Sequence, residues 1–291
     1  MQTIQVASGT VIGRDHRIKG ENGQDALVLF DSERSIVGVV ADGCGSGKWS
    51  EVGARFGAHS TAMLIQQNLG YFEAASSESE LRDILDYIES SLVERLLGAI
   101  TSMGGRKSIL VSEYFLFTVV AVVVTQSWLT IISFGDGAYG CNGEVKSLGP
   151  FPDNAPPYLA YKISGSSLEH CRPELLSFSI CARLPLAEVS SCFIGTDGVM
   201  DLENAATHHM PGKEEELGSV SQFWLEDRYF NNPDMLRRRL FLANKDSYRA
   251  VPVGTGKARL VHDPGLLPDD TTLIVLRSNL SSLVDREESH G

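Results

Sequence analysis

The chain is organised around the run Ile36-Val37-Gly38-Val39-Val40-Ala41-Asp42-Gly43-Cys44-Gly45-Ser46-Gly47. Its first half is apolar and β-branched, which predicts a buried strand. That strand ends on Asp42, and the alternating glycines after it let the backbone come close to a ligand. A carboxylate at the end of a rigid strand suits a bound cation or phosphate. We therefore expect a binding site at this strand end, followed by a helix from about Ser50.

Other predicted strands end in the same way. An apolar run at residues 189–196 leads to Asp197, and another at residues 128–134 leads to Asp136. Asp269 comes shortly before the last predicted strand, residues 273–276. Because these strands end in the same way, we expect their aspartates to line one binding site.

A short turn joins the central strand to the one before it. Residues 26–30 and 36–42 are separated by Asp-Ser-Glu-Arg, which predicts a hairpin. In an antiparallel pair the start of one strand and the end of the next lie at the same edge. Asp25 and Asp42 should therefore be neighbours, the first geometric indication of a metal site.

Composition excludes several classes of protein. With 43% apolar and 21% charged residues, the 291-residue chain should form a globular fold with an ample core. The formal net charge of −12 should repel nucleic acid and anionic membrane, so neither is an expected partner. Residues 115–124, the longest apolar stretch, are too short to span a bilayer, and residues 1–6 do not resemble a signal peptide. The five cysteines show no CxxC spacing, which indicates neither zinc nor disulfides. A reduced, cytoplasmic protein is expected.

The pattern of strands and helices predicts an α+β fold. Helical spacing of apolar residues marks residues 50–68 and a strongly amphipathic helix from Leu81 that ends near Gly104, with shorter candidates at 222–225 and 234–244. Strands outnumber helices and are mostly joined by short turns, including strand-like residues 158–163. This arrangement favours antiparallel sheets with helices packed outside rather than a doubly wound parallel sheet.

Five aspartates stand at strand ends beside glycines or polar turns: Asp25, Asp42, Asp136, Asp197 and Asp269. Hard divalent cations such as Mg²⁺ and Mn²⁺ prefer oxygen ligands and need only a few carboxylates. Two ions about 3.5–4 Å apart can share a carboxylate and a water, and can make that water a hydroxide near neutral pH. The residues therefore predict a two-metal hydrolase acting on phosphate, in which a metal-bridging hydroxide attacks phosphorus without a covalent enzyme intermediate.

These elements resemble, in order and spacing over nearly the whole chain, the metal-dependent (type 2C-like) protein serine/threonine phosphatases. Gly23-Gln24-Asp25-Ala26 is similar to the family's Asn-Gln/Glu-Asp element, and Ala41-Asp42-Gly43-Cys44-Gly45 to its Asp-Gly-His-Gly element. The other matches are Gly135-Asp136, Thr196-Asp197-Gly198-Val199-Met200-Asp201 and Asp269-Asp270-Thr271-Thr272, the last resembling Asp-Asn-x-Thr.

The resemblance implies a four-layer αββα sandwich, with two central antiparallel sheets flanked by helix pairs. Residues 1–280 would be one phosphatase domain with a variable segment at about 203–257, and residues 281–291 a polar tail. The cofactors would be two Mn²⁺ or Mg²⁺ ions and a third, weaker one. The substrate would be a phosphorylated protein, and the partner a cognate serine/threonine kinase or its targets.

The resemblance also implies roles for individual residues. Asp42 would bridge both ions and the Gly43 carbonyl would bind one of them. Asp25 would reach the ions directly or through water, Asp197 and Asp269 would hold the other ion, and Asp136 would hold the third with Asp201. The family's phosphate-binding arginine corresponds to Arg14 or Arg17, and Arg14 is preferred.

Departures from the family pattern leave a second interpretation open. Cys44 replaces the histidine proposed as general acid, and Gly137 and Ala138 replace the serine and arginine after Gly-Asp. A catalytically weak or inactive binding or sensor domain on the same fold is therefore the alternative. A nucleotide-binding enzyme is disfavoured because the glycines after Asp42 lack the Walker A ending. Cys44 is expected to be a small filler, and His16 a solvated loop residue.

Overall fold

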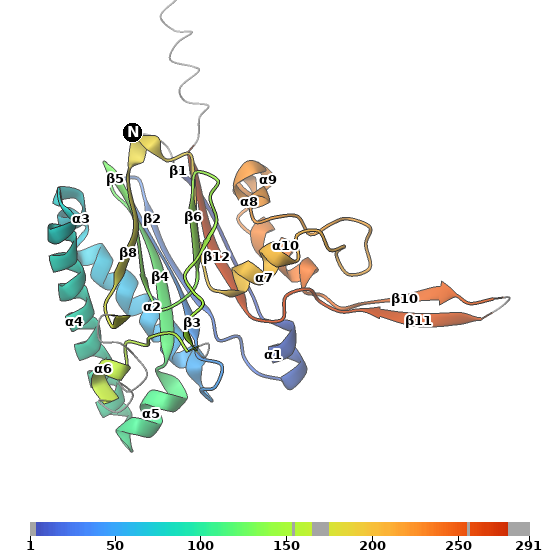
Figure 1. The fold of residues 1–291 in the computed structure, drawn as a ribbon, viewed down its shortest axis with the longest axis horizontal. Helices are drawn as coiled ribbons and strands as arrows, with labels where there is room; N and C mark the ends of the chain where they lie inside the picture. The colour runs from blue at the N-terminus through green and yellow to red at the C-terminus, as the bar shows by residue number, and fades with distance from the viewer. Residues whose placement is uncertain (1–3, 153–154, 165–174, 255–256, 279–291) are drawn as a thin grey trace, which may run out of the picture.

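The computed structural model describes residues 4–152, 155–164, 175–254 and 257–278. Two central sheets face each other and carry helices on their outer faces, which gives four layers (Figure 1). This arrangement confirms the α+β fold and the αββα sandwich expected from the sequence. The predicted polar tail, residues 281–291, lies outside the described residues.

All pairings within the two five-stranded sheets are antiparallel. The first sheet has the order β1 (Ile4–Val11), β12 (Thr271–Ser278), β9 (Ser191–Gly195), β6 (Ala138–Cys141) and β7 (Lys146–Ser147). The second has the order β2 (Ala26–Ser32), β3 (Ser35–Gly43), β4 (Phe117–Val124), β5 (Trp128–Phe134) and β8 (Ser179–Pro185).

The apolar strand residues form the core between the sheets. Val40, Val120 and Ile131 from the second sheet belong to the same buried cluster as Ile194 and Ile274 from the first. Strands buried on both faces are near-continuous apolar runs, and every residue of β4 is buried. The run at residues 36–42 is apolar for this reason, because β3 is sandwiched between a helix layer and the other sheet.

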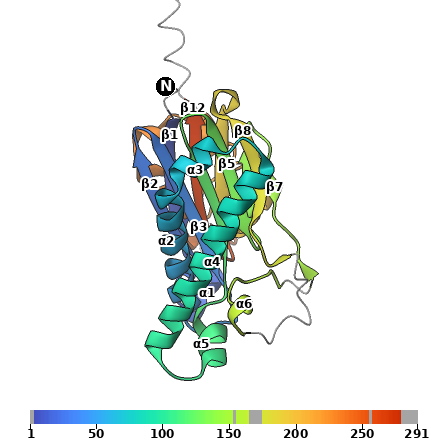
Figure 2. The same cartoon turned by 90° about the vertical axis from the view of Figure 1, so that its left-hand side faces the viewer.

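One outer layer consists mainly of α2 (Ser50–Gln67) and α4 (Glu78–Met103), with α3 (Leu69–Ala74) and α5 (Lys107–Tyr114) beside them (Figure 2). The side chain of Ser77 caps α4 by accepting from the amide of Glu80 at 3.2 Å. From Leu81 to Ile100 the buried apolar residues of α4 recur at intervals of three or four and pack inward.

The other outer layer is made of short helices: α7 (Gly198–Asn204), α8 (Gln222–Leu225), α9 (Arg228–Asn231) and α10 (Met235–Ala243). Leu236 and Leu240 of α10 are fully buried in a cluster that includes Leu273 and Val275 of β12. Helices were predicted at residues 222–225 and 234–244, and α8 and α10 confirm both.

Three segments differ from expectation. Residues 158–163 were predicted to be strand-like, but α6 (Tyr161–Ser164) is helical and Tyr158 packs with Leu96 and Phe115. The apolar stretch 115–124 is not a strand over its whole length, because α5 ends at Tyr114 and β4 begins at Phe117. A two-stranded ribbon that was not predicted begins at the end of the 203–257 segment and extends beyond it, with β10 (Ser247–Pro252) pairing with β11 (Ala258–Asp263). Tertiary packing overrides local propensity in the first two cases.

Within the described part of the chain, every helix is too short or too polar to cross a membrane.

Candidate functional site

The candidate site lies where the ends of strands from both sheets meet. In the β2–β3 hairpin Ala26 pairs with Ala41, which places Asp25 and Asp42 side by side at one edge of the second sheet. This pairing confirms the predicted hairpin and the shared edge of its two carboxylates.

Two aspartates of the first sheet face this edge. Asp197 follows β9 and precedes α7, and Asp269 stands two residues before β12. The hydroxyl of Thr196 donates to Asp25 Oδ2 at 2.8 Å, which links the two sheets directly at the site. Thr196 was not predicted as a site residue, although it adjoins Asp197 in the motif.

Asp136 lies in the connection that carries the chain from β5 to β6, and so from one sheet to the other. Its neighbours Gly135 and Gly137 have φ values of 89° and 137°, in the region that favours glycine. A Cβ on Gly137 would also lie 2.8 Å from the carbonyl oxygen of Gly195. The glycine at position 137 is therefore required by the backbone, which accounts for one departure from the family pattern.

Electrostatics show that these carboxylates converge. Burial, followed by the charges of Asp25, Asp197, Asp269 and Asp136, raises the pKa of Asp42 well above its usual range. Burial and the charges of Asp136 and Asp269 raise the pKa of Asp197 to about 7. Carboxylates that raise one another's pKa in a buried site are costly unless protons or cations neutralise them.

The donor set fits a hard divalent cation. Asp25 Oδ1 is buried and has no hydrogen-bond partner among the described residues. Burial and the charge of Asp270 raise the Asp25 pKa as well. Gly43 is the last residue of β3, and its amide donates to the carbonyl of Gln24. This hydrogen bond holds the end of β3 next to the residues that precede β2. Oxygen donors that repel one another in a buried pocket are the kind of ligand set such a cation needs.

Asp201 extends this group along α7. Burial makes the largest contribution to the raised pKa of Asp201, and the charges of Asp269 and Asp15 raise this pKa further. Burial also raises the pKa of Asp136, again with a contribution from Asp269. Asp269 is thus close to both residues expected at the third, weaker site.

His16 is not the solvated loop residue that was expected. It lies in α1 (Arg14–Lys19), is 9% exposed, and its Nδ1 is 3.0 Å from Oδ1 of Asp270. His16, Asp269 and Asp270 also have possible ligand atoms within 4.8 Å of one another. Asp270 nevertheless accepts from the amides of Gly13 and Gln24, so its oxygens are already occupied. We therefore favour the five aspartates as the cation site and assign Asp270 a supporting position.

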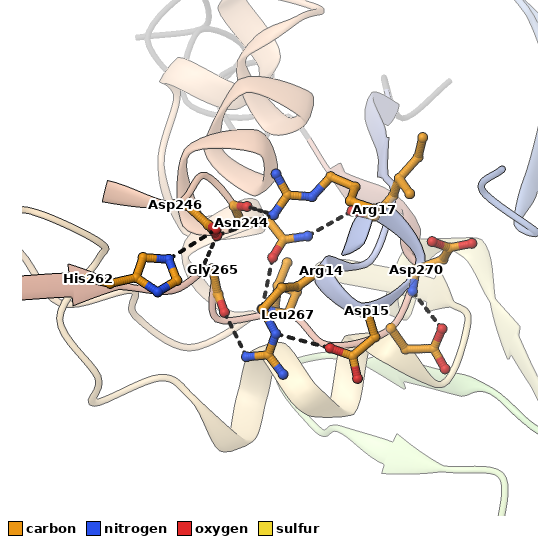
Figure 3. Close-up of polar contacts among 11 residues, drawn as sticks. Arg14, Asp15, Arg17, Asn244, Asp246, His262, Gly265, Leu267 and Asp270 are labelled. Carbon is orange, nitrogen blue, oxygen red and sulfur yellow. Dashed lines mark hydrogen bonds and ion pairs between the residues drawn. The ribbon is translucent and has the colours of Figure 1, made fainter. Parts of the chain in front are cut away.

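The two candidate arginines point in different directions from α1 (Figure 3). Arg14 donates to the Gly265 carbonyl at 3.0 Å and to Asp15 at 3.0 Å, and Arg17 donates to the Asn244 carbonyl. Asp15 is near enough to Asp201 to raise its pKa. Arg14 therefore lies on the side of the aspartates, whereas Arg17 faces the base of the β10–β11 ribbon.

Cys44 sits among small and hydroxyl-bearing side chains. Its Sγ is 3.2 Å from Ser46 Oγ. Burial, and then a hydrogen bond with the Cys44 side chain, raise the pKa of Tyr158. Tyr158 was missed from the sequence because its segment gave no motif, yet it contacts the position where the family has histidine.

A groove of about 730 Å³ adjoins Asp25 and runs beside the edge strands β1 and β2. Arg55 and His59 of α2 and Arg237 of α10 line it. Asp234 also lines the groove and pairs with Arg237 at 2.6 Å, so the lining combines basic and acidic side chains.

Comparisons with known proteins agree with this geometry. The model of the protein phosphatase 2C family matches residues 12–222, which is most of the chain. The chain belongs to this family, as the sequence motifs indicated.

Solved structures show the same fold. A bacterial serine phosphatase has 15% identity and a TM-score of 0.53, over 96% of this chain and 98% of that one. Stp1 from Staphylococcus aureus has 14% identity and a TM-score of 0.51, over 95% of each chain. A serine/threonine phosphatase of S. agalactiae has 17% identity and a TM-score of 0.51, over 95% of this chain and all of that one (100%). No curated protein sequence matches the chain.

Proposed function

We propose that this protein is a Mn²⁺- or Mg²⁺-dependent phosphatase that hydrolyses phosphoserine and phosphothreonine in proteins. The observation that carries the proposal is the convergence on Asp42 of four other carboxylates drawn from both sheets and their connection. Membership of the protein phosphatase 2C family supports the reaction class. A phosphorylated protein, and a serine/threonine kinase that acts on it, are the proposed partners.

Two ions, when bound, supply Lewis acidity that lowers the pKa of a water and neutralises the phosphoryl oxygens. Asp42 is the proposed bridging ligand, with Asp25 and the Gly43 carbonyl on one ion and Asp197 and Asp269 on the other. Thr196 holds Asp25 in place through its 2.8 Å hydrogen bond, so that the carboxylate needs little rearrangement on binding.

Asp136 and Asp201 are the proposed ligands of a third ion. Their shared neighbour is Asp269, whose charge raises the pKa of each. A site with fewer buried carboxylates should bind its ion more weakly than the site around Asp42.

Arg14 is the proposed phosphate-binding residue. Its side chain is 29% exposed, and its guanidinium is held by Asp15 and the Gly265 carbonyl. Arg55 and His59, in the groove beside Asp25, are further cationic or polar groups on the same approach.

We further propose that residues 1–280 form one phosphatase domain. The last strand, β12, pairs with both β1 and β9 in the middle of the first sheet, which supports this extent. The variable segment at about 203–257 supplies the outer helices α8 to α10 and leads into the ribbon, whose second strand ends at Asp263.

Hydrolysis of p-nitrophenyl phosphate and of a phosphoserine peptide, with and without Mn²⁺, tests the function. Metal-dependent turnover of both by the wild type, abolished in Asp42→Asn, is the expected result. The alternative is a binding or sensor domain without activity. It is favoured by Cys44, which stands where the family has the histidine proposed as general acid and whose Sγ contacts Ser46. Manganese binding without any turnover would support that alternative and overturn the enzyme proposal.

A further inference from the structure

Two cysteines lie opposite each other in the first sheet. Their spacing along the chain predicted no disulfide, but in the register of β6 and β9 Cys141 is paired with Cys192. Both are free thiols in the structure. Opposite residues on neighbouring strands point to the same face of a sheet, and both side chains belong to the apolar cluster between the two sheets. The fold therefore brings together two thiols that are far apart in the chain.

The pairing of these strands also sets the distance between the two cysteines. The amide of Asn142 donates to the carbonyl of Ser191 at 2.8 Å, so the next pair along the ladder, Cys141 and Cys192, is of the non-hydrogen-bonded kind. Opposite residues of that kind have Cα atoms about 4.5 Å apart. A disulfide needs Cα atoms roughly 4.4–6.8 Å apart, so the bond can form with little movement of either strand.

Cys141 is the more reactive thiol of the pair. It is half-buried, whereas Cys192 is 1% exposed. A hydrogen bond from the Cys192 thiol lowers the pKa of Cys141, and the charge of Lys146 lowers it further, against the opposing effects of burial and of Glu144. The same hydrogen bond and burial raise the pKa of Cys192. A partly exposed thiol of lowered pKa next to a second thiol is the arrangement of a peroxide-sensitive cysteine and its resolving partner.

Cys181 is another thiol near Cys141, but it lies in the wrong sheet. It extends from β8 into the same cluster, where its Sγ donates to Ser133 Oγ at 3.2 Å. Burial is the main cause of its raised pKa, and Cys141 contributes. Stacked sheets lie about 10 Å apart, which is more than the Cα separation that a disulfide bridges. Cys192 is therefore the partner that the geometry favours.

We propose that Cys141 and Cys192 form a reversible disulfide when the protein meets hydrogen peroxide, and that this bond fastens β6 to β9. The Cys141 thiolate attacks one peroxide oxygen and the O–O bond breaks. The hydroxide that leaves takes up the proton that Cys141 had released, which gives water. The Cys192 sulfur then attacks the sulfenic acid on Cys141, the S–O bond breaks, and a second water leaves with the Cys192 proton. Two thiols are oxidised and one peroxide is reduced to two waters.

The bond would join the two strands that lead to the candidate site. β6 follows Asp136 and β9 precedes Asp197. The cysteines stand at the other end of this strand pairing from Ala138 and Gly195, which are the paired residues nearest to the two aspartates. Oxidation should therefore stabilise the strand pair without displacing the aspartates.

Peptide mapping of the wild type after treatment with hydrogen peroxide tests the bond, in EDTA so that no metal catalyses the oxidation. Trypsin cuts after lysine and arginine, so cleavage after Lys146 and Arg183 places Cys141 and Cys192 in separate peptides. Mass spectrometry without reduction should find these peptides joined. Dithiothreitol should separate them, because exchange with the dithiol reduces the bond. The melting temperature should be roughly 5 °C higher for the oxidised protein than for the reduced one.

Two variants distinguish the roles of the thiols. Cys192→Ala removes the resolving thiol and keeps the buried position apolar. The sulfenic acid on Cys141 should then persist, and its labelling by dimedone should rise severalfold over the wild type. Cys181→Ala is the matched control, because it removes a thiol from the same cluster. It should leave the joined peptides and the shift in melting temperature unchanged.

The proposal is overturned if the two peptides of the native wild type stay separate after peroxide treatment, or if the Cys141 peptide is joined to the one that contains Cys181. If Cys192→Ala does not fold, the rates of iodoacetamide labelling in the reduced wild type replace it. Faster labelling of Cys141 than of Cys192 supports the assigned roles, and equal rates contradict them.

Discussion

Oδ1 of Asp270 lies 3.0 Å from Nδ1 of His16, and the same carboxylate accepts hydrogen bonds from the amides of Gly13 and Gln24. Asp270 is 2% exposed. One buried side chain thus ties α1, the loop before β2 and the start of β12 together. Because Gln24 adjoins Asp25 and Asp270 adjoins Asp269, this contact sets the distance between two proposed cation ligands.

Asp270→Asn should destabilise the protein, even though the family pattern that the chain resembles has asparagine at this place. An amide has only one oxygen, so its NH₂ group would face one of the two amide donors and leave it unpaired. Losing a buried hydrogen bond in this way costs about 1–3 kcal/mol, offset in part by relief of the repulsion on Asp25. Urea unfolding in EDTA measures the difference. The control is Asp31→Asn on the exposed surface of β2, which should change little, and equal stability of Asp270→Asn and wild type would contradict the prediction.

Asp42→Asn should abolish phosphatase activity and stabilise the metal-free protein. Loss of a bridging ligand should lower turnover at least hundredfold. Even replacing a residue that only hydrogen-bonds to a metal ligand lowers metal affinity or activity roughly 10–100-fold. Without metal, the neutral side chain relieves the repulsion that raises the Asp42 pKa, so the melting temperature in EDTA should rise by a few degrees. Wild-type turnover of the variant in Mn²⁺ would show that Asp42 is not a metal ligand.

Stability of the metal-free protein should fall as the pH rises from about 4 to 7. Burial and neighbouring carboxylates raise the pKa of Asp197 in the folded state to about 7 from its ordinary value of 3.8, so the folded state holds more protons than the unfolded state between these values. Stability decreases with pH wherever the folded state binds more protons. Thermal unfolding in EDTA across this range measures the slope. Asp197→Asn should make this slope smaller. Mn²⁺ should reverse the slope, because the ion competes with protons for the carboxylates. A melting temperature that rises with pH in EDTA would contradict the prediction.

Gly198→Ala should destabilise the site wall, whereas Gly98→Ala should not. A Cβ at position 198 would lie 2.0 Å from the carbonyl oxygen of Asp270, so α7 and β12 would have to separate. Such overpacking costs about 1–3 kcal/mol and would move Asp197 away from Asp269. Gly98 lies within α4 with nothing within 4 Å of its Cβ position. Alanine there should stabilise by about 0.5–1 kcal/mol. Denaturant midpoints compare the two directly, and similar midpoints would show that α7 has room to move.

Local signals in the sequence were strong where a residue's environment is set by its own neighbours. The apolar run before Asp42, the short turn between residues 26–30 and that run, and the spacing of apolar residues in α4 each predicted an element that the structure has. Residues 158–163 and the ribbon were harder, because their conformations depend on contacts with α4, α5 and α1.

The sequence by itself determined the α+β class, from the apolar patterns of its strands and helices, and the set of aspartates at strand ends, because a hard cation requires carboxylates. The four-layer αββα arrangement was expected from the family resemblance. Only the tertiary structure decided that Asp270 and His16 brace the site, that Arg14 and Arg17 diverge from α1, and that a two-stranded ribbon stands beside it. Those relationships join residues far apart in the chain. The hydrogen bond between Gly13 and Asp270, for example, joins residues 257 positions apart. No local pattern encodes such pairs, because they depend on how the two sheets stack.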